Sequence, residues 1–182
     1  MSLQVVLIGL PATGKTTTGR RLAKILGTDF TDSDELVEAA TGRTVAEIFA
    51  DDGEDAFRHA ESGAVVAALA TRDGVLALGG GALAADATRA ALVAADVPIV
   101  LLEAPIATLT GRVGDAHTRP LLVDDPADRL RSLSEERAAL YREYATLVVD
   151  TDGRNPGQVA ALIAARLHDR DRGRPQASVD PR

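Results

Sequence analysis

The feature that most constrains this chain is a glycine-rich segment near its N-terminus, Gly9-Leu-Pro-Ala-Thr-Gly-Lys-Thr16. The segment matches the pattern G-x-x-x-x-G-K-[ST] and follows the apolar run Leu3–Ile8, which is typical of a strand buried on both faces. The residues after it, Thr16–Leu26, have helical spacing and end at Gly27. In this order of strand, loop and helix, backbone N–H groups at the helix N-terminus point at phosphate oxygens. The chain is therefore predicted to bind a nucleoside triphosphate.

Two side chains of this loop have a direct role in handling a triphosphate. Lys15 places a positive charge on the β- and γ-phosphates, and the Thr16 hydroxyl is a ligand for Mg²⁺. Backbone groups of the loop and of the first helical turn supply the remaining contacts. The residues of this segment and of the helical turn after it that are predicted to bind the nucleotide are Pro11, Ala12, Thr13, Gly14, Lys15, Thr16 and Thr17.

Composition excludes several other classes of protein. The chain has 182 residues, 46% of them hydrophobic, which is enough for one domain with a sizeable core. A formal net charge of −7 and an aromatic content of 3% disfavour binding to nucleic acids and to anionic membranes. The absence of cysteine excludes disulfides, cysteine-based metal sites and a thiol nucleophile. Since the sequence has neither a membrane-length apolar stretch nor a signal peptide, we expect a cytoplasmic protein, and a monomer because no surplus apolar face is evident.

Segments with strand and helix patterns alternate along the rest of the chain. Further strands are predicted at Thr28–Thr31, Val75–Leu78, Pro98–Leu102 and Leu147–Val149. Further helices are predicted at Glu35–Ala40, Glu54–Ala70, Ala87–Ala95, Ile106–Arg112, Ala127–Tyr144 and Pro156–Leu167, with one more after a capping box formed by Thr44 and Glu47. The alternation predicts right-handed βαβ units in a three-layer α/β/α sandwich around a parallel sheet.

We expect one domain, residues 1–168, with two segments that break the alternation. Residues 112–126 contain two prolines and the pair Asp124-Asp125 between helices, which is typical of a mobile lid. Residues 169–182 mix charges with Gly, Pro and Ser without periodicity, which is typical of a disordered tail.

The residues after the second and third strands indicate which class of nucleotide-binding protein the chain belongs to. No guanine-reading Asn-Lys-x-Asp or Thr-Lys-x-Asp stretch is present, and the third strand ends in Gly79-Gly80-Gly81 rather than in an acidic helicase motif. These features favour a small-molecule kinase over a GTPase or a helicase. Asp32 and Asp34 end the second strand. In a parallel sheet the carboxyl ends of the strands lie together and ligands bind there, so both carboxylates are expected beside the phosphate loop, residues 9–16. One carboxylate would align the acceptor hydroxyl and the other would hold hydrated Mg²⁺, unless Ser33 or Asp34 merely caps the next helix.

Other polar residues suggest an acceptor site, each with a structural alternative. Three consecutive glycines favour close backbone approach to a ligand over a simple turn. Arg58 is placed to bind a carboxylate with Glu61 orienting it, or else forms only an ion pair within its helix. Arg119 in the predicted lid is placed to reach the transferring phosphoryl group, or else is a solvated loop residue. Arg137 alternatively pairs with neighbouring carboxylates along its own helix.

Taken together, these residues resemble the shikimate kinase family from Leu3 to about Leu167. The motifs that carry the resemblance are the phosphate loop, Asp32-Ser33-Asp34, Phe57-Arg58-His59-Ala60-Glu61, Leu76-Ala77-Leu78-Gly79-Gly80-Gly81, Arg119-Pro120-Leu121-Leu122, and Glu136-Arg137 with Leu140-Tyr141 and Tyr144-Ala145. The resemblance implies a P-loop fold like that of nucleoside monophosphate kinases, with strand order 2-3-1-4-5. It also implies Mg²⁺- and ATP-dependent phosphorylation of the 3-hydroxyl of shikimate, a step toward chorismate.

The resemblance assigns a role to each matching position. Lys15, Asp34 and Arg119 correspond to catalytic residues, and Thr16 and Asp32 correspond to the Mg²⁺ site. Arg112 and Arg119, with Arg154 and Pro156, correspond to further nucleotide contacts. The positions that correspond to shikimate contacts, with residues 33–61 as the main binding region, are Asp34, Phe49, Phe57, Arg58, Gly79, Gly80, Gly81 and Arg137. Without the resemblance, ordinary core packing is the better interpretation of Phe49 and Phe57.

The chain departs from the family pattern in the phosphate loop. Ala12 stands where the family usually has glycine, and Thr13 replaces the commoner serine. If position 12 has a positive φ, alanine there costs on the order of 1 kcal/mol. Three alternatives stay open: a kinase of another polyol acid such as gluconate, a nucleotide-binding protein without catalysis, and a nucleoside or nucleotide kinase.

Overall fold

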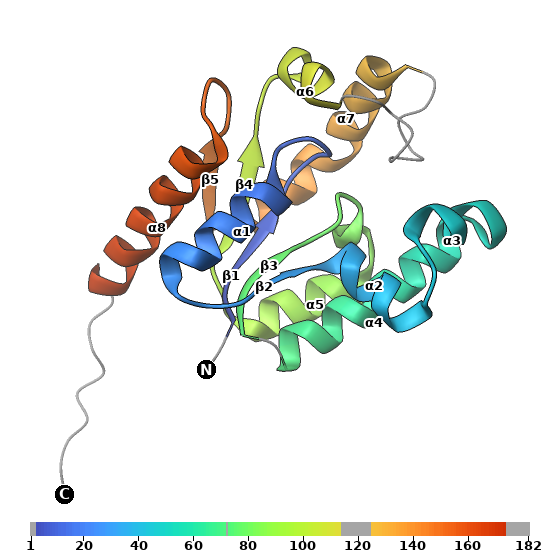
Figure 1. Cartoon of the computed structure of the whole chain (residues 1–182), viewed down its shortest axis with the longest axis horizontal. Coiled ribbons are helices and arrows are strands. Elements are labelled where there is room, and N and C mark those ends of the chain that lie inside the picture. Colours follow the sequence, from blue (N-terminus) through green and yellow to red (C-terminus); the bar gives the residue numbers. More distant parts are fainter. Residues whose placement is uncertain (1–2, 72, 114–124, 174–182) are drawn as a thin grey trace, which may run out of the picture.

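Five parallel strands form the centre of the molecule (Figure 1). The structure, a computed structural model, describes residues 3–71, 73–113 and 125–173. The strands are β1 (Leu3–Ile8), β2 (Phe30–Asp32), β3 (Gly74–Ala77), β4 (Ile99–Glu103) and β5 (Leu147–Asp150). Their order in the sheet is β2-β3-β1-β4-β5, and every neighbouring pair is parallel. The predicted fold class and strand order are confirmed.

Helices cover both faces of the sheet, as its buried strands require. The helices are α1 (Lys15–Leu26), α2 (Ser33–Thr41), α3 (Val45–Asp51), α4 (Gly53–Thr71), the 3₁₀ turn η1 (Ala82–Ala84), α5 (Asp86–Ala95), α6 (Ile106–Val113), α7 (Pro126–Tyr144) and α8 (Pro156–Gly173). Alternate residues of β1 point to opposite faces. Val5 and Leu7 pack in the core under α1 and α8, whereas Val6 and Ile8 pack in the core under α4, α5 and α7. The result is the predicted three-layer arrangement.

The phosphate loop connects β1, the central strand, to α1. Because all the strands run in one direction, the loops after β1, β2 and β3 emerge at the same edge of the sheet. The short helices α2 and α3 pack against α4 through a small separate core that includes Val37, Ile48 and Phe57. This packing holds the residues after β2 next to the start of α4 (Figure 1).

Three elements have a boundary that differs by two or more residues from the sequence-based expectation. β2 lies later than Thr28–Thr31, since its pairing with β3 begins at Phe30. Ser33 and Asp34 belong to α2 rather than to the end of the strand, because Asp32 caps this helix by accepting a hydrogen bond from the Asp34 N–H at 3.1 Å. The last helix, expected to end near Leu167, continues to Gly173, since the chain has no helix-breaking glycine or proline until Gly173.

Most of the predicted lid, residues 112–126, and most of the predicted tail fall outside the described residues, whereas the ends of the lid segment belong to α6 and to the start of α7. Residues 114–124 include Arg119, and residues 174–182 include all of the tail except the part within α8. In the described part of the chain, no helix is both long enough and apolar enough to cross a membrane.

Gly74, at the start of β3, is a position where the fold requires glycine. Its φ is +93°, and a Cβ there would lie 2.2 Å from the carbonyl oxygen of Asp29, which accepts the Val75 N–H. We expect Gly74→Ala to lower the free energy of unfolding by about 2–4 kcal/mol, from backbone strain plus the clash. Urea denaturation measures this loss.

Gly27→Ala is the matched control for this prediction. Gly27 also has a positive φ, +66°, but a Cβ there would have nothing within 4 Å. Only the strain of about 1 kcal/mol should appear in the control. Equal losses for the two variants would contradict the close approach at Gly74.

Candidate active site

A cavity of about 570 Å³ lies at the carboxyl ends of the strands. It is bounded by the phosphate loop, by the segments after β2, β3 and β5, and by α3, α4, α6 and α7. The sequence-predicted site residues that line it are Pro11, Ala12, Thr13, Gly14, Lys15, Thr16, Thr17, Asp32, Asp34, Phe49, Phe57, Arg58, Gly79, Gly80, Gly81, Arg112, Arg137, Arg154 and Pro156. The fold therefore brings all the predicted site residues together except Arg119, which lies outside the described residues.

The phosphate loop has the backbone conformation that anion binding requires. Gly9 has a φ of +144°, and a Cβ there would lie 2.4 Å from the carbonyl oxygen of Leu102. Gly14, with a φ of +90°, precedes the first turn of α1. The Lys15 ammonium donates to the carbonyl oxygens of Gly9 and Leu10 at 2.8 and 3.0 Å. The lysine charge therefore lies over the loop, where the N–H groups of the helix N-terminus also converge.

Ala12 has the backbone conformation that its position in the loop suggested. Its φ is +64°, in the left-handed region that favours glycine. The methyl group packs against the apolar cluster of α6 and α7, which includes Leu109 and Leu130. This contact offsets part of a strain of roughly 1 kcal/mol. The loop therefore keeps its shape with alanine at this position.

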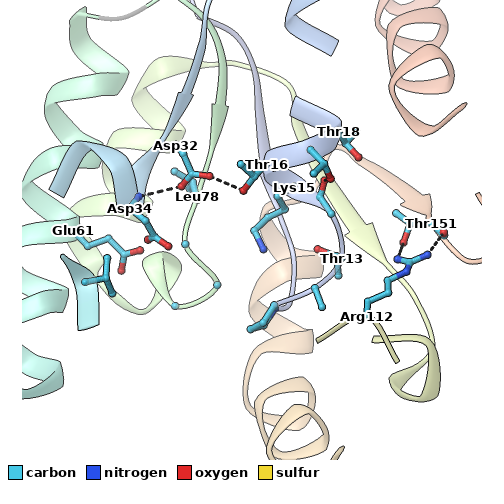
Figure 2. Close-up of a pocket in the computed structure, with 18 of the residues that line it drawn as sticks. Thr13, Lys15, Thr16, Thr18, Asp32, Asp34, Glu61, Leu78, Arg112 and Thr151 are labelled. Carbon is cyan, nitrogen blue, oxygen red and sulfur yellow. Dashed lines mark hydrogen bonds between the residues drawn. The ribbon is translucent and has the colours of Figure 1, made fainter. Parts of the chain in front are cut away.

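Thr16 and Asp32 join the phosphate loop to the second strand. The Thr16 hydroxyl donates to Asp32 Oδ2 at 2.7 Å (Figure 2). Asp32 thus caps α2 with one oxygen and contacts α1 with the other. A hydroxyl and a carboxylate fit Mg²⁺, which takes few protein oxygens and completes its shell with water and phosphate oxygens. Among the described residues, no cluster of three or more histidine or acidic side chains offers a self-sufficient metal site.

Asp34, in the first turn of α2, lies next to this pair and lines the same cavity (Figure 2). Burial raises the pKa of its carboxyl to about 6, and the negative charges of Asp32 and Glu61 add to the rise. Lys15 and Arg58 act in the opposite direction. A carboxyl with a pKa near 6 is deprotonated at neutral pH and is still basic enough to accept a proton from an alcohol in a transition state.

Arg58, Glu61 and the glycine turn form one end of the cavity. Arg58 Nη1 donates to Glu61 Oε2 at 2.7 Å, and Arg58 Nη2 donates to the more exposed Glu54 at 3.0 Å. Glu61 is 1% exposed, and burial raises its carboxyl pKa. A Cβ on Gly81 would lie 2.4 Å from the central guanidinium carbon of Arg58. A side chain at position 81 would therefore displace the Arg58 guanidinium. The contact with Glu61 is an ion pair within α4, as one interpretation of Arg58 expects, and it also leaves the guanidinium at the cavity, as the other requires.

Arg137 approaches the same end of the cavity from α7. A Cβ on Gly80 would lie 3.3 Å from Arg137 Nη1. The alternative interpretation, an ion pair along its own helix, is wrong, since no carboxylate in the described part of the chain lies within 4.0 Å of Arg137. Two arginines from different helices thus flank one glycine turn.

Phe49 and Phe57 form the apolar wall at this end of the cavity. Their ring centroids are 4.8 Å apart, and the guanidinium carbon of Arg58 lies 5.2 Å from the Phe57 ring centroid. Both rings also pack in the small core of α2, α3 and α4. The two readings of these residues, core packing and ligand contact, are therefore compatible.

The other end of the cavity lies between α6 and the segment after β5. Arg112 donates to the Thr151 hydroxyl at 2.9 Å and to the Thr151 carbonyl oxygen at 2.7 Å, which joins α6 to the segment after β5. Arg154 donates to the Asp150 carbonyl oxygen at 2.8 Å. Figure 2 shows Lys15 and Thr16 between this end and the end that holds Asp34 and Glu61. The phosphate loop thus lies between two subsites.

Sequence reasoning missed the roles of three polar residues. Ser33 accepts a hydrogen bond from the Gly79 N–H at 2.7 Å, and the Tyr141 hydroxyl donates to the Gly80 carbonyl oxygen. Thr151 holds Arg112, as described above. Ser33 was considered only as a helix cap, and Tyr141 only as part of a motif. Their contacts join segments up to 61 residues apart in the chain, which local patterns cannot reveal.

A phosphate loop on a parallel sheet shares one cavity with two arginines, Arg58 and Arg137, and with the carboxyl groups of Asp34 and Glu61. This arrangement defines a P-loop phosphotransferase that acts on a small molecule. The family model described as shikimate kinase matches residues 11–168. The shikimate kinase of Mycobacterium tuberculosis is 50% identical over 168 residues, which cover 92% of this chain and 94% of that relative. The chain belongs to the shikimate kinase family.

Comparison with solved structures agrees. The shikimate kinase of Acinetobacter baumannii, solved in complex with shikimate, is 34% identical and superposes with a TM-score of 0.86 over 92% of this chain and 94% of that one. A gluconokinase from Sinorhizobium meliloti, 18% identical with a TM-score of 0.59 over 94% of each chain, shares the fold alone.

Proposed function

We propose that this protein transfers the γ-phosphoryl group of ATP to the 3-hydroxyl of shikimate, giving shikimate 3-phosphate and ADP. The observation that carries this proposal is that Asp34, Arg58 and Arg137 line the same cavity as the phosphate loop. Membership of the shikimate kinase family supports the same reaction. The product would serve the pathway toward chorismate and the aromatic amino acids.

The acceptor subsite has the groups that a small hydroxy acid needs. Arg58 and Arg137 supply planar guanidinium donors for the carboxylate, and the Glu61 carboxylate holds Arg58 in place. The N–H groups of the glycine turn supply further donors, and Phe49 and Phe57 pack against the apolar ring edge. Asp34 then accepts the hydrogen of the attacking hydroxyl and aligns it with the γ-phosphorus.

The nucleotide subsite supplies charge rather than covalent chemistry. Lys15 and the N–H groups of the loop neutralise the β- and γ-phosphates, and Arg112, Arg154 and Pro156 enclose the nucleoside. Thr16 and Asp32 would hold Mg²⁺, which supplies further neutralisation of the phosphate charge when bound. Arg119 remains a predicted contact to the transferring group from its sequence position, and the monomeric state and cytoplasmic location remain predictions as well.

The alternatives differ in what the acceptor subsite should contain. A nucleoside kinase needs aromatic or amide side chains to recognise a second base, whereas this subsite has two arginines and two carboxyl groups around a glycine turn. A binding protein without catalysis has no need of Asp34 near the phosphate loop. A gluconate kinase shares the fold, so only acceptor specificity separates it from the proposal.

A coupled assay of ADP release with MgATP tests the proposal. We expect strong stimulation by shikimate and none by gluconate or a nucleoside. Stimulation by gluconate alone would contradict the choice of acceptor. No stimulation by any acceptor, with ATP binding demonstrated by titration calorimetry, would contradict catalysis.

Asp34→Asn should lower kcat by about 10²–10⁴-fold and leave the KM for MgATP nearly unchanged, because the amide cannot accept the proton. In the unmodified enzyme, kcat/KM for shikimate should rise with pH up to about 6 and level off above it, since the Asp34 carboxyl must be deprotonated to act. Steady-state kinetics between pH 5 and pH 8 measures both effects.

Glu35→Gln is the control for this variant. Glu35 is the next acidic residue of α2 but is exposed and pairs with Arg20. Its kcat should stay within about twofold of the unmodified enzyme, since the change affects only a surface ion pair. An unchanged kcat in Asp34→Asn would remove Asp34 from the chemical step.

Gly81→Ala should displace the Arg58 guanidinium and raise the KM for shikimate roughly 10- to 100-fold, the loss expected for a charge-assisted contact. The φ of Gly81 is −106°, which alanine adopts freely, so the close contact with Arg58 alone causes the effect. The KM for MgATP should be unaffected. Steady-state kinetics with each substrate varied in turn separates the two.

Gly63→Ala, on the same helix as Arg58, is the matched control. A Cβ at Gly63 has nothing within 4 Å, and alanine favours helix by up to about 1 kcal/mol. Kinetics should be unchanged and stability slightly raised. A wild-type KM for shikimate in Gly81→Ala would contradict the assignment of Arg58 to the acceptor.

A further inference from the structure

The turn of Gly79, Gly80 and Gly81 is held by one hydrogen bond from each of two neighbouring helices. The Gly79 N–H donates to the Ser33 hydroxyl of α2 at 2.7 Å. The Gly80 carbonyl oxygen accepts from the Tyr141 hydroxyl of α7. Three consecutive glycines have little conformational preference of their own, so these two contacts limit which way the peptide groups of the turn face.

These contacts orient the peptide groups of the turn and leave the N–H groups of Gly80 and Gly81 without a hydrogen bond to any described residue. All peptide bonds in the described residues are trans, so a carbonyl and the following N–H point in opposite directions. The Gly80 carbonyl points to Tyr141, which turns the Gly81 N–H the other way. The Gly79 carbonyl accepts from the Ala82 N–H at 3.1 Å, which fixes the Gly80 N–H in the same manner.

Neither of these N–H groups has an acceptor within the described part of the protein. The three glycines nevertheless line the cavity. Leaving a buried backbone N–H without a hydrogen-bond partner costs free energy. The two N–H groups are therefore available to donate hydrogen bonds to a ligand in the cavity.

Tyr141 is buried, and its hydroxyl is the part that contacts the glycine turn. The residue is 4% exposed, and its ring packs in the core beneath the sheet. Burial raises the pKa of the hydroxyl, and the charge of Arg137 and a hydrogen bond from its guanidinium offset this only in part, so at neutral pH the group keeps the proton that it donates. Arg137 lies one turn earlier on the same helix, and positions i and i+4 share a helix face. One face of α7 therefore presents an arginine to the cavity and a tyrosine to the glycine turn.

We propose that Tyr141 is a positioning residue for the acceptor: its hydroxyl orients the Gly80–Gly81 peptide so that the Gly81 N–H faces the bound substrate, in register with Arg137. The inference rests on the proposed function, since it takes shikimate as that substrate. Tyr141 itself does not touch the substrate. It acts through the backbone of the turn.

The test is Tyr141→Phe, which removes the hydroxyl and keeps the ring. We expect the KM for shikimate, and its dissociation constant without nucleotide, to rise about three- to tenfold, the loss of roughly one hydrogen bond. The KM for MgATP should stay within about twofold, because the phosphate loop is untouched. A purely structural role would instead affect both substrates through overall stability.

Tyr144→Phe is the matched control. Tyr144 lies on the same helix and is partly buried against the same core, and no hydrogen bond of its hydroxyl is found within the described residues. Its kinetics should be those of the unmodified enzyme. An unchanged KM for shikimate in Tyr141→Phe, or equal rises for both substrates, would overturn the proposal.

A second measurement uses the unmodified chain and so does not depend on the variant folding. Hydrogen exchange by NMR should show the Gly81 amide exchanging rapidly without ligand and protected at saturating shikimate. Absence of protection would overturn the proposal. The failure of the proposed function would look different: the unmodified enzyme would then show no shikimate-dependent ADP release.

Discussion

The burial of β1 on both faces is the constraint on which the rest of the structure depends. Its last four residues, Val5–Ile8, are at most 1% exposed and pair with a strand on each side. Because β1 is the central strand and its neighbours run parallel to it, the loop that follows β1 emerges beside the carboxyl ends of those neighbours. The phosphate loop, Asp32 and the glycine turn meet there because the strands before them are parallel.

The electrostatics of the cavity reconcile an acidic chain with two anionic ligands. Basic side chains enter from α1, α4, α6 and α7, while the net charge of the whole chain is −7. The carboxylates that accompany them have separate tasks. Glu61 orients Arg58, Asp32 joins two helices, and Asp34 is left facing the cavity with its pKa raised by burial and by its two acidic neighbours.

Several contacts around the cavity serve the fold and the site at once. Asp32 caps α2 and also binds the Thr16 hydroxyl, so the helix that carries Asp34 cannot shift without moving the phosphate loop. Ser33 and Tyr141 hold the glycine turn from opposite helices. The acceptor subsite is thus held by elements that also form the core, which suits a site that must keep two reactants in line.

The sequence by itself determined the parallel α/β fold and the phosphate loop, because both depend on local patterns: apolar runs, helical spacing and a glycine-lysine motif. The resemblance to the shikimate kinase family, which rests on the order of several motifs, also predicted that Asp34, Arg58 and Arg137 belong to one site. Only the tertiary structure decided that Asp32 rather than Ser33 or Asp34 caps α2, that Arg137 faces the cavity rather than a carboxylate on its own helix, and that Tyr141 reaches Gly80. These outcomes depend on the packing of segments far apart in the chain, and no local pattern encodes which of two available partners lies nearer.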